Sequence, residues 1–401
     1  DDDYVRQLAT LLKSQLNVGS KIYVEYSNEV WNGIFSQFGI NRDLASRAVQ
    51  AGAGSALAYD GSTDLNTLGM RRVAQRGKDI SDIFRAVYGD AAMLTTVRPV
   101  FASQVVQPYV ARVGLDFIDA VYGPPSRYFY ALAGAPYFNL GSRQQTDGLT
   151  TAGVLQAMSD SIDALPDVNQ FEKNMALARW YGLSFLAYEG GSDTFGPGSI
   201  AAKKAASLDP QMLALCQRYL HTWFSQGGGL FMWFTAGAGN WDTRYGTWEL
   251  TPDLALGNTP KIQCIDTLRA SAPTALLARN TVPGSLDALA YVGNPEPFSD
   301  ASKTTLRYLH PGSYLDYLVL APQGGSHELI ITAEAARPGN TVNVLLNQHP
   351  IATAFELKAL GWGTAADNNA IRLTLPQGFS TLRIQTLTEN LGFSMSRLRI
   401  R

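Results

Sequence analysis

Apolar segments of strand length alternate with helical patterns through the first 275 residues of this 401-residue chain. Strands that are apolar on both faces and are joined by helices form parallel sheets with helices packed on them. We therefore predict an α/β domain over residues 1–275, with five parallel strands in sequence order. The expected strands are 21–26, 93–101, 128–133, 183–188 and 229–234, and the expected helices are 71–88, 108–122, 151–181 (broken near Pro166), 203–224 and 259–270.

The pattern changes after about residue 280. Short segments of alternating polarity follow one another there, and Gly, Pro and Asn turns separate them. This pattern is typical of an antiparallel β-sandwich of the jelly-roll kind. We therefore predict a linker at 276–284 and a sandwich at 285–401, with strands near 314–320, 328–333, 343–346, 370–375, 381–386 and 395–400.

Composition excludes several classes of function. Charged residues make up 16% of the chain and the net charge is −2, so we expect no nucleic-acid partner. No apolar run approaches the roughly 20 residues that span a bilayer. With only four histidines, the chain is poorly supplied for a Ser–His–Asp triad or a His-rich metal centre, and we expect no metal and no cofactor. The chemistry therefore falls to carboxylates.

The chain has two cysteines, Cys216 and Cys264. Two cysteines alone do not make a zinc site, and neither belongs to a C-x-x-C pair. The sequence leaves open whether they form a disulfide or remain as buried thiols.

Two glutamates close predicted strands. Glu29 follows the first strand in S-N-E-V-W, and Glu189 follows the fourth in L-A-Y-E-G-G. Two further strands, near 93–101 and 128–133, lie between these two, so three βα units separate the two glutamates. Cleavage of a glycosidic bond with retention needs an acid and a nucleophile, two carboxyl groups about 5–5.5 Å apart. We predict that Glu29 and Glu189 face each other at this separation.

An Asn–Glu pair that closes one strand, with a glutamate closing the third strand after it, resembles clan A of the glycoside hydrolases. This clan contains retaining (β/α)8 TIM barrels such as cellulases and mannanases. The resemblance implies that residues 1–275 hold barrel strands 4–8. Strands 1–3 are then expected upstream of Asp1 or on another chain, and this upstream part is an expected partner.

The resemblance also implies roles for individual residues. Glu29 resembles the acid/base and Glu189 the nucleophile, while Asn28 would hydrogen-bond the 2-hydroxyl of the sugar. Tyr137 is similar in place to the tyrosine that steadies the nucleophile. Trp233, on the last strand, resembles the aromatic floor under the reactive sugar.

Other aromatic residues lie near these strand ends in sequence. Trp31 follows Glu29 by two residues and is a candidate to line a subsite. Trp241 and Tyr245 lie in the loop after the last strand, where they are candidates to stack on sugars. Each has an alternative role in packing. Glu25 alternates with Val24 and Tyr26, and we interpret it as structural.

The two glutamates should influence each other's pKa. Once Glu189 is ionised, its charge should raise the pKa of a nearby Glu29, so that Glu29 keeps the proton that an acid needs. After the glycosyl–enzyme forms, Glu29 can ionise and act as the base that activates water.

The C-terminal region resembles the β-sandwich carbohydrate-binding modules that are often fused to such enzymes. The resemblance lies in G-S-Y-L-D-Y-L-V-L-A-P at 312–322 and in I-R-L-T-L-P-Q-G-F-S-T-L-R-I at 371–384. Tyr291, Tyr308 and Trp362 are candidates for a sugar platform. The alternative is a sandwich that only braces the first domain.

Together these features predict a retaining β-glycoside hydrolase that acts on a polysaccharide or oligosaccharide. We expect it to be secreted or at the cell surface, in an extracellular or periplasmic setting. The alternative is a non-catalytic carbohydrate-binding protein, or a structural protein of the matrix or cell surface, on a degenerate barrel.

Overall fold

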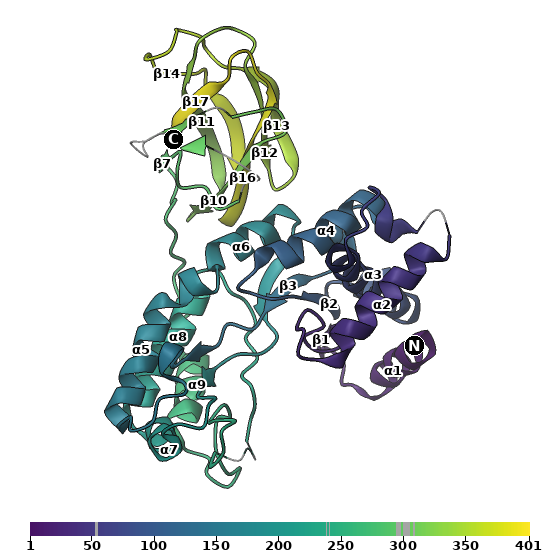
Figure 1. Ribbon diagram of the computed structural model, residues 1–401, viewed down its shortest axis with the longest axis vertical. Coiled ribbons are helices and arrows are strands. Elements are labelled where there is room, and N and C mark those ends of the chain that lie inside the picture. The colour runs from purple at the N-terminus through teal and green to yellow at the C-terminus, as the bar shows by residue number, and fades with distance from the viewer. Residues whose placement is uncertain (53–54, 238, 240, 294–297, 300–304, 308) are drawn as a thin grey trace. The chain divides into compact units, whose positions relative to one another are not determined.

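The computed structural model describes residues 1–52, 55–237, 239, 241–293, 298–299, 305–307 and 309–401 (Figure 1). The chain divides into two compact units. The first consists of Asp1–Phe171 and Leu183–Ala275, and the second of Glu172–Gly182 and Leu276–Arg401.

The first unit is built on a parallel sheet of four strands. They are β1 (Ile22–Val24), β2 (Val97–Ala102), β3 (Ala131–Gly134) and β5 (Ser184–Ala187), paired in that order. The fifth expected strand, 229–234, runs beside β5 but pairs with it through a single parallel bridge, Ala187 to Phe231. The sequence therefore predicted the order of four strands, whereas the fifth segment is not a regular strand.

The sheet is open. Among the described residues, no pairing joins β1 at one edge to the segment 229–234 at the other. The closed barrel that the sequence resemblance implied is therefore not formed by the described part of this chain, because a barrel needs its two edge strands joined. That three further strands complete it stays a prediction.

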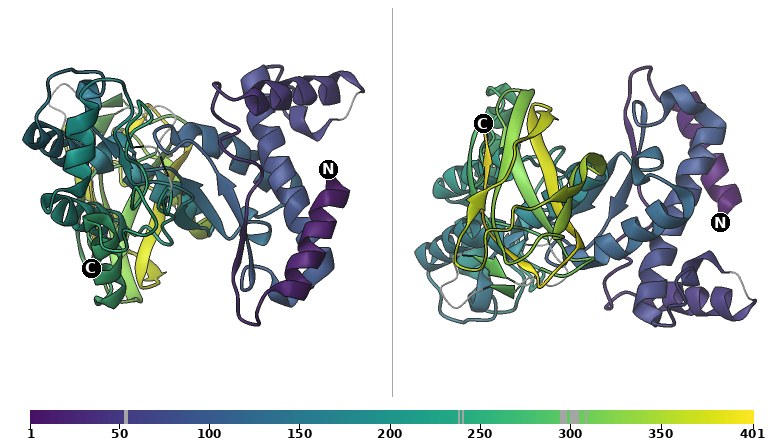
Figure 2. Two further views of the ribbon diagram at one scale, coloured as in Figure 1. Left: turned by 90° about the horizontal axis from the view of Figure 1, so that it is seen from below. Right: turned by 90° about the horizontal axis from the view of Figure 1, so that it is seen from above.

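Helices cover one face of this sheet. α1 (Asp2–Gln15), α2 (Ser36–Gln50), α3 (Leu65–Tyr88) and α4 (Pro108–Tyr122) belong to this half of the unit. Figure 2 shows α1, at the N-terminus, lying along α3. Val5 of α1 and Phe84 of α3 share a core with Ile22 and Val97 of the sheet. Because residues alternate along a strand, Tyr23 and Glu25 are left on the opposite, inner face.

The helices in the second half of this unit differ from those expected in their breaks. Pro166 lies inside α5 (Thr151–Val168), and the break comes at Gln170, where φ is +50° and α6 (Phe171–Trp180) follows. The expected helix 203–224 is two helices, α7 (Ile200–Leu208) and α8 (Gln211–Ser225), because Pro210 cannot continue the first. None of the helices in the described ranges is long and apolar enough to cross a membrane.

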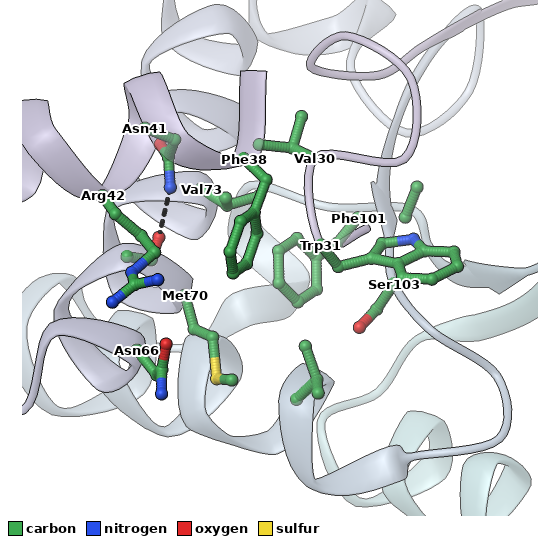
Figure 3. A pocket seen from close by; sticks show the side chains of 13 residues that line it. Val30, Trp31, Phe38, Asn41, Arg42, Asn66, Met70, Val73, Phe101 and Ser103 are labelled. Carbon is green, nitrogen blue, oxygen red and sulfur yellow. Dashed lines mark hydrogen bonds between the residues drawn. The ribbon is translucent and has the colours of Figure 1, made fainter. Parts of the chain in front are cut away.

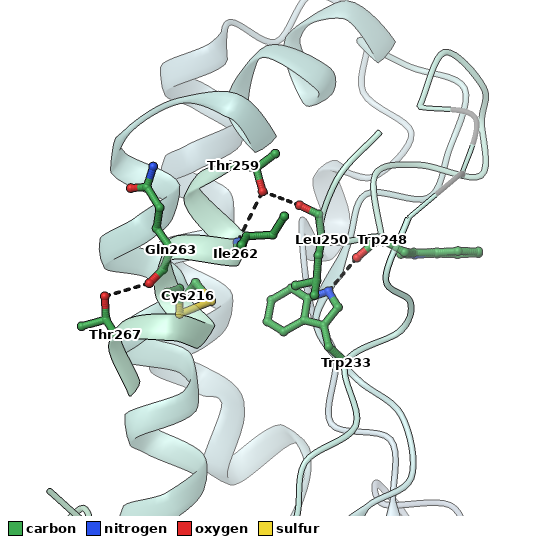
Figure 4. Close-up of a disulfide and its surroundings, with 9 residues drawn as sticks. Cys216, Trp233, Trp248, Leu250, Thr259, Ile262, Gln263 and Thr267 are labelled. Carbon is green, nitrogen blue, oxygen red and sulfur yellow. Dashed lines mark hydrogen bonds between the residues drawn. A yellow bond between two sulfur atoms is a disulfide. The ribbon is translucent and has the colours of Figure 1, made fainter. Parts of the chain in front are cut away.

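A disulfide joins Cys216 of α8 to Cys264 of α9 (Pro260–Ala270), with their Cα atoms 6.1 Å apart (Figure 4). The structure thus decides a question that the sequence left open. The remaining short elements of this unit are the 3₁₀ helices Ala56–Ala58, Asp90–Ala92, Pro125–Arg127 and Gly141–Arg143, and the paired strands β4 (Phe138–Asn139) and β6 (Ser192–Asp193).

The second unit contains two antiparallel sheets, as expected for a β-sandwich. One holds β10 (Tyr314–Ala321), β16 (Gly378–Thr388), β12 (Thr341–Leu346) and β13 (His349–Glu356) in that order. The other holds β14 (Ala366–Asp367), β11 (Gly325–Ala335), β17 (Phe393–Ile400), β9 (Leu306–Arg307) and β8 (Phe298–Ser299), with β15 (Ile371–Leu375) paired to β11 and β7 (Gly284–Asp287) to β17. Buried residues such as Tyr317, Val344 and Leu398 form its core.

Two segments join this unit in ways that local patterns did not indicate. Glu172–Gly182, in the middle of the expected helix 151–181, belongs with the sandwich, where Thr381 Oγ1 donates to the carbonyl of Ala176 at 2.7 Å. The expected linker 276–284 is also part of the unit, since Val282 is buried and its N–H bonds to Leu320.

Candidate functional site

The first parallel strand and the fourth bring Glu29 and Glu189 to the same place. Glu29 lies five residues beyond β1 and Glu189 two residues beyond β5, so both leave the carboxyl edge of the sheet. The two carboxyl groups lie close enough to interact electrostatically. Burial first, and then the nearby charge of Glu29, raises the pKa of Glu189 to about 7. The separation of about 5–5.5 Å stays a prediction.

The two carboxyl groups influence each other electrostatically. Burial, and then the charge of Glu29, raise the pKa of Glu189, because both disfavour its charged form. That the charge of Glu189 keeps a proton on Glu29 stays a prediction. Two close carboxyls that cannot both ionise hold one proton between them at neutral pH. One shared proton is what an acid and a nucleophile need together.

The loop after β1 is held in an unusual backbone conformation. Ser27 and Glu29 have φ values of +60° and +44°, in the left-handed region that costs energy for residues with a side chain. Side-chain bonds secure it. Asn32 Nδ2 donates to Glu29 Oε2 at 2.7 Å, and Gln37 Nε2 donates to the carbonyl of Asn28 at 3.0 Å. Strain that is kept in place beside a carboxyl pair is typical of functional sites.

Two tyrosines position the Glu189 side. Tyr137 is near enough to Glu189 to donate a hydrogen bond to it, which lowers the pKa of the carboxyl against the larger effect of burial. The hydroxyl of Tyr219 donates to the carbonyl of Pro136 at 2.6 Å and accepts from the N–H of Gly191 at 3.0 Å. Tyr219 therefore ties the residue before Tyr137 to the turn after Glu189.

The two glycines after Glu189 allow close packing. A Cβ on Gly190 would come within 2.6 Å of the Phe231 ring, and one on Gly191, where φ is +125°, within 2.7 Å of Trp233. The absence of a side chain at these two positions therefore lets the turn pack against both rings. Trp233 is half-buried, and its Nε1 donates to the carbonyl of Trp248 at 2.9 Å (Figure 4). It therefore lies beside the turn that carries Glu189.

A cavity of about 250 Å³ opens in front of the inner face of the sheet. Asn28 and Glu189 line it, together with Glu25 and Tyr188. Burial, and then the charge of Glu29, raises the pKa of Glu25 to about 7. Burial and the surrounding carboxylates raise the pKa of the Tyr188 phenol. The sequence analysis interpreted Glu25 as structural, although its alternation with Val24 and Tyr26 was a signal for the inner face.

The other predicted aromatic residues lie in different surroundings. Trp241 is 2% exposed, its Nε1 donates to Glu249 Oε2 at 2.7 Å, and the Lys261 ammonium lies 4.8 Å from its ring. An indole so buried presents no face to a sugar, which corrects its expected role in stacking. Tyr245 is 54% exposed and lies next to Phe195, with ring centroids 6.4 Å apart.

Trp31 lines a second, smaller pocket rather than the cavity that Glu189 lines (Figure 3).

The three candidates for a sugar platform in the sandwich differ in their surroundings. Trp362 is exposed and Tyr291 packs against the core, while Tyr308 lies outside the described residues. Within the described ranges, no group of three or more His, Cys, Asp or Glu side chains is arranged to hold a metal ion.

Comparison with known proteins gives low-scoring structural similarity only. Neither protein-family models nor curated proteins match this sequence. Among solved structures, the C-terminal CBM6 of the laminarinase LamC from Zobellia galactanivorans is 15% identical, with a TM-score of 0.25, over 29% of this chain and 96% of that one. A family 35 carbohydrate-binding module from Clostridium thermocellum is 17% identical, with a TM-score of 0.22, over 26% and 98%. The Podospora anserina GH26-CBM35 β-(1,4)-mannanase is 15% identical, with a TM-score of 0.25, over 29% and 27%.

Proposed function

We propose that this protein is a retaining β-glycoside hydrolase that acts on a polysaccharide or oligosaccharide. The observation that carries the proposal is that Glu29 and Glu189 interact at one edge of a parallel sheet, where Asn28 and Glu189 line a cavity of about 250 Å³. Their shared proton provides the acid and the nucleophile that double displacement needs.

In the first step, the carboxylate of Glu189 attacks the anomeric carbon and forms an ester as the glycosidic bond breaks. Glu29 gives its proton to the leaving oxygen. In the second step, Glu29 takes a proton from water, the water oxygen attacks the anomeric carbon, and the bond to Glu189 breaks. The proton returns to Glu29, so the enzyme is unchanged. Tyr137 donates toward Glu189 and steadies it, and Asn28, which lines the same cavity, binds the sugar.

We extend the proposal to the rest of the active site. Trp233 and Tyr245 bind the substrate, and strands that the described residues do not supply cover the inner face of the sheet. Exposed apolar side chains on that side, Leu230 and Met232, support this part of the proposal.

The disulfide supports a secreted or cell-surface location, since disulfides persist in oxidising compartments.

The test compares two single-residue variants of the protein with the unsubstituted protein. The release of reducing ends is measured on β-glucans, β-mannans, xylans and galactans. Glu189→Gln should abolish turnover, because no glycosyl–enzyme can form. Glu29→Ala should lose less activity on substrates with good leaving groups, and azide should partly restore its rate. Glu328→Gln, in the sandwich, is the matched control and should retain full activity.

Near-normal turnover by Glu189→Gln would refute its role as the nucleophile. Absence of turnover on every substrate, together with retention on one of these polysaccharides, would instead favour the alternative of a carbohydrate-binding protein without catalysis.

A further inference from the structure

The segment 247–250 lies in the loop after the last expected strand and belongs to no helix or strand. Its four consecutive backbone carbonyls nevertheless all accept hydrogen bonds from side chains. Loops normally run over the surface and are more mobile than the elements that they connect. A segment held at every carbonyl is an exception, and its rigidity needs a reason.

Two residues at the start of α9 bind three of these carbonyls. Lys261 Nζ donates to the carbonyls of Thr247 and Glu249, and Thr259 Oγ1 donates to the carbonyl of Leu250 at 2.6 Å (Figure 4). The Lys261 side chain is fully buried, and burial of an ammonium is costly unless hydrogen bonds compensate it. The disulfide joins α9 in turn to α8. The first turn of α9 therefore fixes this segment to the rest of the unit.

The fourth carbonyl and the indole of Trp248 are fixed as well. Trp233 Nε1 donates to the Trp248 carbonyl at 2.9 Å, and Trp248 Nε1 donates to Asp193 Oδ1 at 2.8 Å. Trp248 is nevertheless only half-buried, and Figure 4 shows its ring extending away from Trp233 and from the disulfide. Trp248 therefore combines a fixed orientation with an accessible part of its ring.

Trp241 of the same loop provides a comparison. It is also held by a hydrogen bond, from its Nε1 to Glu249, but it is only 2% exposed. Trp241 therefore packs the loop from within. The partial exposure of Trp248 is not explained by packing in the same way.

A row of aromatic rings connects Trp248 to the surroundings of Glu189. The ring centroids of Trp248 and Phe234 are 5.6 Å apart, and those of Phe234 and Tyr137 are 6.4 Å apart. Tyr137 in turn interacts with Glu189. Two ring contacts therefore join Trp248 to the tyrosine that steadies the proposed nucleophile.

This arrangement suits the binding of a sugar ring. A sugar presents C–H groups on its faces, and these pack against the face of an aromatic ring. An indole that is already held in place loses little conformational freedom when a ligand binds, so more of the contact energy is available for affinity.

We propose that Trp248 is a further substrate-binding residue, which stacks on the sugar unit next to the one that Glu189 attacks. The inference rests on the proposed function, because the stacked sugar belongs to the chain that Glu29 and Glu189 cleave. It goes further in naming the substrate class, an oligosaccharide or polysaccharide chain of three or more units rather than a simple glycoside. Lys261 and Thr259 are positioning residues, since they act only through the segment that carries Trp248.

The experiment measures binding in the absence of turnover. The protein carrying Glu189→Gln is titrated calorimetrically with cello-, manno-, xylo- and galacto-hexasaccharides and with the matching nitrophenyl β-monoglycosides, which fill only the two positions at the cleaved bond. At least one hexasaccharide should bind more tightly than its monoglycoside. Trp248→Ala in this background should raise the Kd of that hexasaccharide by about tenfold, equivalent to about 1.4 kcal/mol, and leave the Kd of the monoglycoside unchanged.

Further variants in the same background separate stacking from folding. Trp248→Phe keeps an aromatic ring and should raise the hexasaccharide Kd by only about threefold. Thr259→Val removes the hydroxyl that binds Leu250 and should also weaken the hexasaccharide alone, whereas Thr259→Ser should restore its affinity. Tyr4→Ala, at a 65% exposed aromatic residue of α1, is the control and should change neither Kd.

The role of Trp248 is overturned if no hexasaccharide binds more tightly than its monoglycoside, or if Trp248→Ala leaves the hexasaccharide Kd unchanged. It is equally overturned if Trp248→Ala weakens both probes alike, because the residue then acts on the fold. An unchanged Kd in Thr259→Val would overturn the positioning role of α9. Binding that depends on Trp248, without turnover by the unsubstituted protein, would refute the hydrolase alone. Turnover with no effect of Trp248→Ala on binding would do the reverse.

Discussion

Asn32 donates a hydrogen bond from its side-chain amide to Glu29, with Nδ2 and Oε2 2.7 Å apart. The Asn32 N–H also bonds to the carbonyl of Glu29 at 2.8 Å, which closes the turn after β1. One residue therefore holds both the backbone and the carboxylate of the proposed acid/base. The sequence analysis did not single out Asn32, since its spacing from Glu29 gains meaning only in this turn.

Substitution of Asn32 by Ala should slow catalysis by about tenfold or more, because a hydrogen bond to a charged group is worth roughly 1.5–3 kcal/mol. The loss should be larger for substrates with poor leaving groups, which depend on the proton from Glu29. The measurement is kcat/KM on two substrates that differ in leaving group. Equal losses on both would argue that Asn32 acts on folding rather than on Glu29.

Activity should decrease above about pH 7. Burial and Glu29 hold the pKa of Glu189 at about 7, so the last proton leaves the carboxyl pair as the pH rises through this value. We expect kcat/KM to fall by about tenfold per pH unit above this range. In Glu29→Gln the repulsion is absent, the pKa of Glu189 falls, and activity on a substrate with a good leaving group should no longer decline there. The same decline in both proteins would contradict this assignment.

Glu25 should make the protein less stable as the pH rises from about 4.5 to about 7. Its folded-state pKa of about 7 lies above the ordinary 4.5, so the folded state keeps the proton longer than the unfolded state does. Each pKa unit is about 1.4 kcal/mol, and partial exposure reduces the total to about 1–2 kcal/mol.

The native protein should lose unfolding free energy between pH 5 and pH 8, and Glu25→Gln should lose less. Urea titrations of both proteins at both pH values would measure this difference. Glu328→Gln, in a solvent-exposed pair with Arg401, is the control and should leave the pH dependence unchanged. If the two proteins showed the same pH dependence, ionisation of Glu25 would have no effect on the free energy of unfolding.

The sandwich contains a buried ion pair whose removal should be costly. Arg383 of β16 bonds to Asp316 of β10 at 2.7 and 2.8 Å, directly across the two strands, and the rings of Trp180 and Tyr314 each lie 3.7 Å from the guanidinium. Asp316→Ala leaves this cation buried without its carboxylate. We expect a loss of about 3–5 kcal/mol in unfolding free energy.

The double variant Asp316→Leu with Arg383→Met should recover most of this loss, because it removes both charges together. Urea unfolding of the three proteins, monitored by tryptophan fluorescence, tests this. A loss below about 1 kcal/mol for Asp316→Ala would mean that water reaches the pair and solvates Arg383.

The sequence by itself determined the approximate positions of most of the longer elements, although not of α2 or β13, and which carboxylates follow the strands. Period-two and period-3.6 patterns are local, and Glu29 and Glu189 follow apolar runs that can be read without any partner strand. The same local reading failed at residues 172–182, since a helical pattern does not indicate which of two cores its side chains will join.

Only the tertiary structure decided the composition of the site. Glu25 and Tyr188 share the cavity of Glu189, Tyr219 joins two strand ends, and Trp241 is buried under its loop, because each of these depends on pairing and packing between segments far apart in the chain. Ser103 and Trp31 meet at one pocket for the same reason. A sequence states which groups are available, whereas burial and proximity, which set hydrogen bonding and pKa, arise only when the chain folds.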